Sequence, residues 1–480
     1  MLNFLEKKSK VSIQDYTKIK NSRKMEGISM EEIKVMVEKA RVAQKEYEGK
    51  FNQEQIDEIV KTVGKTIFDN AEILAKMAVE ETEMGVYEDK VAKNRGKSKG
   101  IWYDLKGKKS VGVLRVDEET NMIEIAKPMG VVAGITPTTN PIVTPMSKIM
   151  FSLKTRNAII IAPHPRSKKC SGEAVRLIKE AISKFGVPED MVQIIAEPSI
   201  EKTGELMKAC DVVVATGGMP MVKSAYSSGK PSFGVGAGNV QVIVDKGVDY
   251  AAAAEKIIAG RKFDNGIICS GEQTIIAPEE DFDQVMDAFV AKGAYLVKAG
   301  EREAVVNAIF DGGHLAKDIV GQSTDYIAKK AGITIPEGTK VLIVEANGIG
   351  AEDVVCKEKM CPVLAAFRYK TIEEGINIAK TNLELEGNGH SAAIHSNSEA
   401  NIQKAGEILS VSRLVVNAPC ATTAGGSIQN GLAVTNTLGC GSWGNNSISE
   451  NFTYKHLMNV TRIAPICDKI VVPTDEEIWA

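Results

Sequence analysis

The amino-acid sequence predicts an α/β protein with two doubly wound domains and a cleft between them. The chain has 480 residues, more than a single hydrophobic core usually supports. From residue 157 onward, short apolar β-prone runs alternate with amphipathic helical segments, and the alternation resumes in the second half. This pattern is typical of parallel sheets whose strands are joined by right-handed helical crossovers.

The first residues differ from this pattern. Residues 1–26 are basic and weakly patterned, and we interpret them as an N-terminal extension, either a tail or a targeting or encapsulation helix. An ordered helix is predicted to begin at Ser29, where Glu32 three residues later completes a capping box. A second helix is predicted to begin at Asn52 with Gln55.

Residues 111–135 form a separate element. Two β-prone runs flank the polar segment 117–121, which predicts a β-hairpin.

The first alternating region predicts a parallel sheet. Its strands are expected at 158–162, 191–196, 211–215 and 240–244. Its helices are expected at 171–185, at 199–209 and in a short segment that ends at 228.

The second alternating region predicts another such sheet. Its strands are expected at 274–278, 340–345, 363–369, 391–395 and 413–417. Its helices are expected at 250–260, 282–291 and 371–383. We find no internal repeat and no low-complexity tract.

Composition and charge argue against several classes of function. A net charge of −3 argues against a surface that wraps nucleic acid and gives no general attraction to acidic membranes. No apolar run approaches the roughly 20 residues of a membrane helix, and the start has no secretory h-region. We therefore expect a cytoplasmic protein, with a bacterial microcompartment as the alternative. The eight cysteines include no C-x-x-C motif and are expected to be reduced thiols.

One cysteine stands out. Cys269 lies among small and polar residues, between a helical run and the strand expected at 274–278. A thiol at such a junction can be surrounded by backbone N–H groups, which favour thiolate and can hold an oxyanion. The alternative, a buried apolar filler, stays open on this stretch alone.

Two glycine-rich segments are candidates for binding a phosphate. Thr216, Gly217 and Gly218 follow a predicted strand and open a helix, so their amides are placed to face a phosphate or a ribose, although this signal alone favours a plain βα turn. The glycines at 234–238 precede a strand instead, and we interpret them as a close-packed turn.

Polar side chains in two further loops are candidate catalytic groups. Asn140 lies between a strand and a helix, where its amide can donate to an oxyanion or form an Asx-turn before Pro141. His390 lies in a glycine-rich loop that suits a general base, a ligand contact or an inert surface histidine. The remaining histidines have no ligand spacing, so we predict no metal site; they are His164, His314, His395 and His456.

Together these motifs resemble the aldehyde dehydrogenase superfamily, specifically its coenzyme A-acylating branch. The branch includes succinate-semialdehyde dehydrogenases that form succinyl-CoA and the aldehyde dehydrogenase half of bifunctional aldehyde–alcohol dehydrogenases. The resemblance runs from about Ser29 to the C-terminus. It rests on Pro-Thr-Thr-Asn-Pro at 137–141, Ala-Pro-His-Pro at 162–165, Ala-Thr-Gly-Gly at 215–218, Phe-Asp-Asn-Gly-Ile-Ile-Cys at 263–269, Glu-Lys-Met-Cys-Pro-Val at 358–363 and Leu-Gly-Cys-Gly-Ser-Trp-Gly at 438–444.

The resemblance implies two Rossmann-like domains, a small β oligomerisation flap and the roles of several residues. Cys269 is the expected nucleophile, and its acyl thioester is taken by the thiol of coenzyme A after hydride transfer to NAD or NADP. Asn140 and the Cys269 amide match the oxyanion site. Glu358 matches the position that orients the nicotinamide ribose, and His390 the loop position linked with the coenzyme A step.

Two departures from hydrolytic relatives are informative. Hydrolytic members carry a glutamate at the position of Gly234, which activates water against the thioester, so glycine there favours acyl-CoA over free acid. The lysine that usually contacts the adenosine ribose is not evident near Ala162. NAD and NADP therefore both stay open, with His164 and Arg166 as candidates for a 2′-phosphate.

The resemblance also suggests a substrate and an assembly. The middle of the chain and its C-terminus look most like the succinate-semialdehyde group, and Arg261 or Lys262 is a candidate for holding a distal carboxylate or sulfonate. Acetaldehyde and sulfoacetaldehyde are the alternative substrates. A hydrolytic dehydrogenase and a non-catalytic scaffold are the rival functions.

The expected organisation has four parts. After the extension come a cofactor-binding domain at 27–245 and a catalytic thiol domain at 246–438. The last part, 439–480, is expected to wrap the cleft or a subunit boundary. With the 111–135 hairpin it fits an oligomerisation flap, so we expect a homodimer or homotetramer that binds neither nucleic acid nor membrane.

Overall fold

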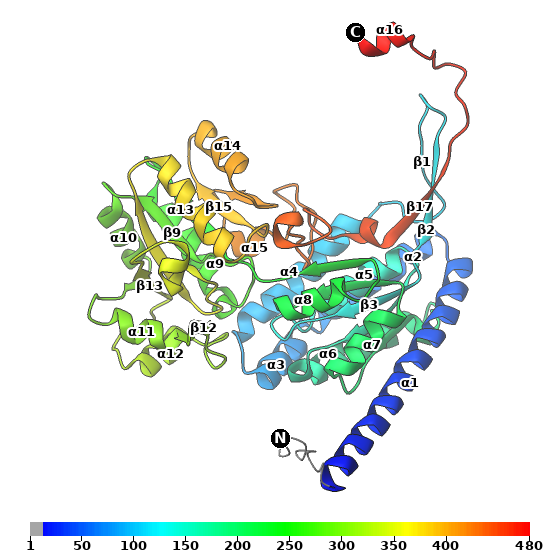
Figure 1. Cartoon of the computed structure of the whole chain (residues 1–480), viewed down its shortest axis with the longest axis horizontal. Helices are drawn as coiled ribbons and strands as arrows, with labels where there is room; N and C mark the ends of the chain where they lie inside the picture. The colour runs from blue at the N-terminus through cyan, green and yellow to red at the C-terminus, as the bar shows by residue number, and fades with distance from the viewer. Residues whose placement is uncertain (1–12) are drawn as a thin grey trace, which may run out of the picture.

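The computed structural model describes residues 13–480, with side chains from residue 31 onward. The chain forms two lobes, each built around a parallel sheet, with a small antiparallel sheet that projects from the first lobe (Figure 1). Within the described residues, no helix has the length and apolar character needed to cross a membrane.

The first sheet has five strands in the order β5-β4-β3-β6-β7, and all neighbours are parallel. The strands are β3 (Val131–Ile135), β4 (Ala158–Ala162), β5 (Val192–Ile194), β6 (Val212–Thr216) and β7 (Ser232–Val235). The central strands β3 and β4 are buried along their whole length, as helices on both faces require. The strand order reverses between β3 and β6, where sheets of this kind bind ligands at their carboxyl edge.

Helices cover both faces of this sheet. They are α1 (Ile13–Lys50), α2 (Gln53–Asp69), α3 (Ala71–Thr82), α4 (Tyr87–Leu105), α5 (Val143–Lys154), α6 (Lys168–Ser183), α7 (Ile200–Ala209) and α8 (Met219–Tyr226). The reciprocal capping box of Asn52 and Gln55 is present and starts α2 as predicted. The predicted helix start at Ser29 is wrong, because α1 begins at Ile13 and runs through that position. The rest of the predicted extension, residues 1–12, lies outside the described residues.

The second sheet has seven strands in the order β10-β13-β14-β9-β8-β15-β16. They are β8 (Gln241–Val244), β9 (Thr274–Pro278), β10 (Ala294–Leu296), β13 (Val341–Glu345), β14 (Val363–Tyr369), β15 (Ala392–His395) and β16 (Leu414–Val416). Because β8 pairs with β9 and β15, it belongs to this second sheet. The expected domain boundary after residue 245 therefore falls too late.

The second sheet has its own helices. They are α9 (Tyr250–Lys262), α10 (Phe282–Ala291), α11 (Arg302–Ile309), α12 (Thr324–Ala331), α13 (Ile372–Leu385), α14 (Glu399–Ile408) and the short α15 (Cys420–Thr423). A small ribbon of β11 (Phe310–Asp311) and β12 (His314–Leu315) lies beside them.

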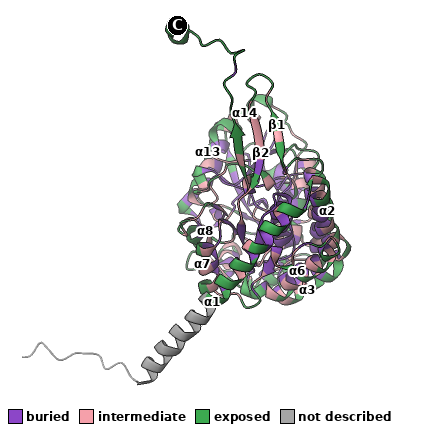
Figure 2. Ribbon diagram, turned by 90° about the vertical axis from the view of Figure 1, so that its right-hand side faces the viewer, coloured by how far each residue is buried: buried purple, intermediate pink, exposed green. Residues whose placement is uncertain are grey.

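The predicted hairpin is confirmed with a correction. β1 (Val113–Val116) and β2 (Ile123–Pro128) are antiparallel, and β17 (Met458–Ile463) pairs with β2 as a third strand. Residues 131–135, however, form β3 of the first sheet. The chain then extends beyond this small sheet to α16 (Asp475–Trp479), and both views show this last segment standing away from the lobes (Figures 1 and 2).

Candidate active site

The two sheets contribute opposite edges to the candidate site. In the first sheet, Asn140 follows β3 and the segment 216–218 ends β6, so both lie at the carboxyl edge. In the second sheet, Cys269, Glu358 and His390 precede β9, β14 and β15, which places them at the amino edge. Parallel strands align these ends, so the residues of each group share one edge of their sheet.

A cavity of about 640 Å³ joins residues of the two lobes. The first lobe contributes α4 and the loop after β3, and the second contributes the loop before β9 and the segment 421–438. Six polar or reactive residues of its lining matter for the argument: Lys93, Lys97, Asn140, Cys269, Ser270 and Asn436. The structure therefore brings the predicted nucleophile and the predicted oxyanion donor to one cavity.

Cys269 is the least buried of the chain's thiols. All eight cysteines lie in the described part of the chain; seven are buried, and Cys269 is partly exposed. It sits in a tight loop in which the Gly271 N–H donates to the Ile268 carbonyl oxygen at 2.8 Å. The alternative of a sealed apolar filler does not fit a thiol that lines a cavity.

Neighbouring groups shift the pKa of the Cys269 thiol in opposite directions. Burial raises the pKa of Cys269 to about 12, and the negative charges of Glu358 and Cys440 add to the rise. The buried guanidinium of Arg413 acts in the opposite direction. Its four hydrogen bonds include those to the carbonyl oxygens of His390 and Gly439 and none to a carboxylate, so its positive charge is not neutralised by an ion pair within the described residues.

The Asn140 amide is held by a residue that the sequence analysis missed. Lys93 Nζ donates to Asn140 Oδ1 at 2.7 Å and to Asp264 Oδ2 at 2.5 Å. Lys90, Lys93 and Lys97 are spaced three and four residues apart on α4, so they follow one face of the helix. That spacing is a signal from which the basic face could have been found.

Glu358 lies close to the loop that carries Cys269. Its Oε1 accepts from the Gly238 N–H at 3.4 Å, and its own N–H donates to Glu386 Oε2 at 2.7 Å. Burial raises the pKa of Glu358 to about 8, with the charge of Glu386 adding to the effect. Glu358 is therefore mainly protonated at neutral pH in this state.

His390 is fully buried and lies next to the loop that carries Cys269. Its Nδ1 is 3.1 Å from Ser391 Oγ, and its Nε2 is buried with no hydrogen-bond partner within the described residues. Burial, aided by Arg413, lowers the pKa of His390 to about 3, so the imidazole is neutral. Of the three alternatives, the inert surface histidine is wrong because the side chain is fully buried.

The cofactor candidates other than Glu358 occupy the carboxyl edge of the first sheet. Residues 216–218 connect β6 to α8, and Thr216 Oγ1 lies 3.3 Å from Thr437 Oγ1. After β4, His164 Nδ1 accepts from the Arg166 N–H at 3.1 Å, while the Arg166 guanidinium donates to the Thr82 carbonyl oxygen at 3.1 Å. Partial burial, with the Arg166 charge, lowers the pKa of His164.

The same edge fits a dinucleotide. Two buried hydroxyls in the loop after β3, Thr136 Oγ1 and Thr138 Oγ1, have no hydrogen-bond partner within the described residues. Buried polar atoms are rarely left unpaired, so these hydroxyls indicate a missing polar partner. Their position next to the reversal of strand order is where doubly wound sheets bind nucleotides.

The predicted substrate contacts are corrected by the structure. Arg261 is completely buried, and its guanidinium donates to the Cys361 carbonyl oxygen. Lys262 lies in a different hollow, beside Lys292 and Lys340. Neither side chain lines the cavity of Cys269. The lysines that do so are Lys93, Lys97 and Lys99. Of these, Lys97 donates through its Nζ to the carbonyl oxygens of Gly425 and Thr435.

Gly234 packs against a helix. A Cβ added there would stand 2.9 Å from both the Tyr226 ring and Val222 of α8. The Tyr226 hydroxyl accepts from the Gly234 N–H at 3.0 Å. The Tyr226 ring thus fills the space that a larger side chain would enter.

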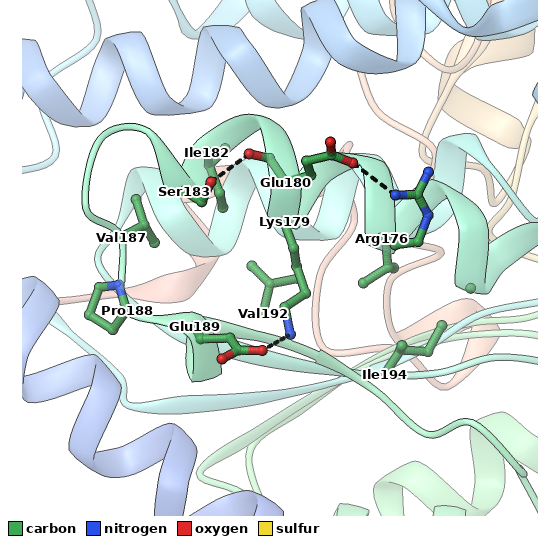
Figure 3. A pocket seen from close by; sticks show the side chains of 12 residues that line it. Arg176, Lys179, Glu180, Ile182, Ser183, Val187, Pro188, Glu189, Val192 and Ile194 are labelled. Atoms are coloured by element: carbon green, nitrogen blue, oxygen red, sulfur yellow. Dashed lines mark hydrogen bonds and ion pairs between the residues drawn. The ribbon is translucent and has the colours of Figure 1, made fainter.

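A second large hollow lies elsewhere in the first lobe. It has a volume of about 560 Å³ and is lined by α6 and β5, including Arg176, Lys179 and Glu189 (Figure 3). Its charged side chains pair with one another, as Lys179 does with Glu189 at 3.6 Å. It shares no lining residue with the cavity of Cys269 and carries no candidate nucleophile.

A family model described as "Aldehyde dehydrogenase family" matches residues 5–432, so the chain belongs to the aldehyde dehydrogenase family. Among its relatives, the succinate-semialdehyde dehydrogenase (acetylating) of Clostridium kluyveri is 55% identical over 448 residues, which cover 93% of this chain and 98% of that protein. The predicted resemblance is thereby confirmed.

Solved structures agree with this assignment. The crystal structure of an acetylating aldehyde dehydrogenase from Geobacillus thermoglucosidasius matches with a TM-score of 0.90 at 39% identity, over 94% of this chain and 99% of that one. A propionaldehyde dehydrogenase from Rhodopseudomonas palustris, solved with bound CoA and an acylated cysteine, matches with a TM-score of 0.81 at 28% identity, over 90% and 97% of the two chains. The predicted fold is confirmed.

Proposed function

We propose that the protein is a coenzyme A-dependent acylating aldehyde dehydrogenase that also runs in reverse as an acyl-CoA reductase. It converts a short-chain aldehyde, CoA and NAD or NADP to acyl-CoA and the reduced nicotinamide. The observation that carries the proposal is that Cys269 and Asn140 line one cavity while Tyr226 fills the space beside Gly234. A nucleophile and an oxyanion donor are present, and a base for water is missing at that position.

Cys269 supplies the covalent step. Its thiolate adds to the aldehyde carbon, and the carbonyl oxygen becomes an oxyanion that the Asn140 amide and the Cys269 N–H stabilise. After the hydride leaves, the acyl group is held as a thioester on the same sulfur. The thiolate of CoA then attacks the thioester carbon, the bond from that carbon to Cys269 breaks, Cys269 leaves as thiolate, and acyl-CoA is released.

The protonation of Glu358 favours transfer of the acyl group to CoA. Glu358 is the carboxyl group whose charge acts most strongly on Cys269, and its pKa of about 8 keeps it mainly protonated at neutral pH. A protonated carboxyl group cannot take a proton from water. Water therefore lacks a base, whereas a thiol attacks a thioester readily.

The nicotinamide cofactor is assigned to the carboxyl edge of the first sheet. When bound, it accepts the hydride from the substrate carbon. Thr216, Gly217, Gly218 and the orphaned hydroxyls after β3 are the groups that would hold it, and Glu358 would orient its ribose from the second lobe. His164 and Arg166 would meet a 2′-phosphate. His390, buried next to the Cys269 loop, is assigned to the CoA step through its unpaired Nε2.

Succinate semialdehyde is the favoured aldehyde. Its distal carboxylate requires a cation in the cavity, and Lys97 provides one. The similarity to the Clostridium kluyveri succinate-semialdehyde dehydrogenase points the same way. Sulfoacetaldehyde would use the same cation through its sulfonate. Acetaldehyde is the alternative that would leave Lys97 unused.

Turnover measured with and without CoA tests the proposal. We expect NAD(P)H formation from succinate semialdehyde to require CoA, and Cys269→Ala to abolish it while leaving the fold intact. Full-rate turnover without CoA would identify a hydrolytic dehydrogenase instead. A protein whose properties are all unchanged by Cys269→Ala would be a scaffold.

The working form is proposed to be a cytoplasmic homodimer or homotetramer. Its support is the small sheet β1-β2-β17, which projects from the first lobe and exposes apolar side chains at Val113, Val116 and Ile463. Such side chains on a projecting sheet are suited to contact a second copy. Sedimentation of the full chain measures the assembly.

A further inference from the structure

We propose that Lys93 is a positioning residue that fixes the orientation of the Asn140 amide, and that Asp264 ties this arrangement to the loop of the nucleophile. The inference rests on the proposed function, because it concerns how the oxyanion donor of that reaction is aimed. Three helical and loop segments meet in this cluster: α4, the loop after β3 and the loop before β9.

The first step is the chemistry of the contact between Lys93 and Asn140. An ammonium group can only donate hydrogen bonds, so the atom of Asn140 that faces Lys93 Nζ at 2.7 Å must be the amide oxygen. The amide nitrogen is then directed away from Lys93. Within the described residues its one partner is Thr139 Oγ1, at the long distance of 3.4 Å. The NH₂ group thus retains donor capacity for an oxyanion in the cavity.

The second step is the anchoring of Lys93 itself. Its side chain is 7% exposed, and its Nζ also contacts Asp264 Oδ2, on a side chain with no exposure. The same carboxylate accepts from Lys90 Nζ at 3.1 Å and from the Val86 N–H at 2.8 Å. Burial opposes ionisation of Asp264, but the two lysines outweigh it and lower its pKa. Lys93 is therefore held by a charged partner as well as by Asn140.

The third step is the connection to the nucleophile. Asp264 precedes Cys269 by five residues and has a left-handed backbone with φ of 52°, which few residue types adopt without support. Its own N–H donates to Asp89 Oδ2 of α4 at 2.8 Å. The start of the Cys269 loop is thus fixed to the helix that also aims Asn140. One cluster sets both the donor and the nucleophile.

Lys90 offers a matched control. It is buried, lies on the same helix face and pairs with the same Asp264 carboxylate, but it makes no hydrogen bond to Asn140. Lys90→Met removes one charge from the cluster without freeing the amide. Lys93→Met also removes one charge, but in addition it frees the Asn140 amide from its lysine partner. Lys93→Gln keeps an N–H able to donate to Asn140 Oδ1.

The test measures kcat and KM for the CoA-dependent reaction in these variants and in Asn140→Ala. Loss of an oxyanion donor lowers kcat roughly 10²–10³-fold. We expect Lys93→Met to lower kcat roughly 10–100-fold with KM for the nicotinamide unchanged, Lys93→Gln to lose less, and Lys90→Met to lose about threefold or less. Added to Asn140→Ala, Lys93→Met should lower kcat by less than about threefold, because the two act as one unit.

Two results would overturn the inference: an equal loss from Lys93→Met in the wild-type and Asn140→Ala backgrounds, or an equal loss from Lys90→Met and Lys93→Met. If Lys93→Met does not fold, Lys93→Met/Asp264→Asn also removes the charge of the carboxylate that has lost one of its two lysine partners, and the same comparison is made. If the wild type shows no CoA-dependent turnover, the proposed function fails first. A crystal structure of Lys93→Gln or Lys93→Met still decides the inference, since an unchanged Asn140 amide in the methionine variant would refute it.

Discussion

The carbonyl oxygen of Cys269 lies 1.9 Å from the point at which a Cβ on Gly238 would stand. Two backbone segments of the second lobe therefore meet at a distance that only glycine allows. The same Cβ would stand 3.2 Å from the ring of His390, so the contact lies between the nucleophile loop and the histidine loop. Any side chain at 238 must move the Cys269 loop.

Gly238→Ala is therefore expected to lower both stability and activity. Overpacking of this kind costs about 1–3 kcal/mol in the free energy of unfolding, and displacement of Cys269 should reduce kcat at least about tenfold. Denaturant unfolding and kcat measure the two effects. Gly204→Ala in α7 is the control, because no atom lies within 4 Å of its added Cβ. A Gly238→Ala variant with wild-type kcat would show that the loop spacing is not required.

The rate of Cys269 alkylation should report its raised pKa. With a pKa of about 12, the thiolate fraction rises about tenfold per pH unit through the neutral range, and the rate with iodoacetamide should follow it. Glu358 raises that pKa only when ionised, and its own pKa is about 8. Glu358→Gln should therefore speed alkylation above pH 8 and leave it nearly unchanged below pH 7.

The exposed Glu384, on the neighbouring α13, is the control for this measurement. Glu384→Gln removes the same charge without changing the environment of the sulfur. Faster alkylation of both glutamine variants, or a plateau of the wild-type rate near pH 8, would contradict the electrostatic account.

Gly234→Glu alone is not expected to create a hydrolytic enzyme. The new side chain would collide with Tyr226 and Val222, so the free energy of unfolding should fall by about 1–3 kcal/mol and turnover should still require CoA. Gly234→Glu combined with Tyr226→Ala removes the ring that fills this space. NAD(P)H formation without CoA should be higher in the double variant than in either single variant. Free acid from Gly234→Glu alone at the wild-type rate would refute the steric argument.

Lys97→Met should raise KM for acidic aldehydes and leave KM for neutral aldehydes nearly unchanged. Loss of a charged hydrogen bond to a carboxylate is worth about 1.5–3 kcal/mol, so KM for succinate semialdehyde should rise roughly 10–100-fold. KM for butyraldehyde should change little. Burial lowers the pKa of Lys97 to about 8, so in the wild type the preference for the acidic aldehyde should weaken as pH rises through that value.

Lys99 is the matched control for this prediction. It lines the same cavity from the same helix but is exposed, and screening by water weakens its attraction to a carboxylate. Lys99→Met should leave both KM values within about threefold of wild type. Equal effects of Lys97→Met on both aldehydes would indicate that Lys97 supports the loop at 425–435 and does not bind substrate.

Local sequence signals predicted most of the secondary structure. The strands β4, β9 and β14 have their predicted bounds, because each is a short apolar run with a polar residue, glycine or proline close to each end. Sheet membership was harder. The apolar run that forms β8 is typical of any buried parallel strand. The sequence does not show which strands it pairs with, and therefore to which sheet it belongs. The start of α1 was missed because the capping pattern at Ser29 also occurs inside a helix.

Only some residues of the candidate site were predicted correctly from the sequence. Cys269 and Asn140 were found because their motifs carry chemistry, and the cavity joins them. Arg261 was misread because a charged residue at a helix end usually meets solvent, whereas this one is buried under the Cys269 loop. Lys93 was missed because its partners lie 47 and 171 residues away in the sequence. Only the tertiary fold brings such groups together.

The opposed sheet edges have a further consequence for motion. Cys269 and the first-lobe groups assigned to the nicotinamide are carried by separate hydrophobic cores. A small rotation of one core against the other would change the spacing between sulfur and cofactor while each core stayed intact. The buried ion pairs of Lys90 and Lys93 with Asp264 join α4 of the first lobe to the second lobe and oppose such a rotation.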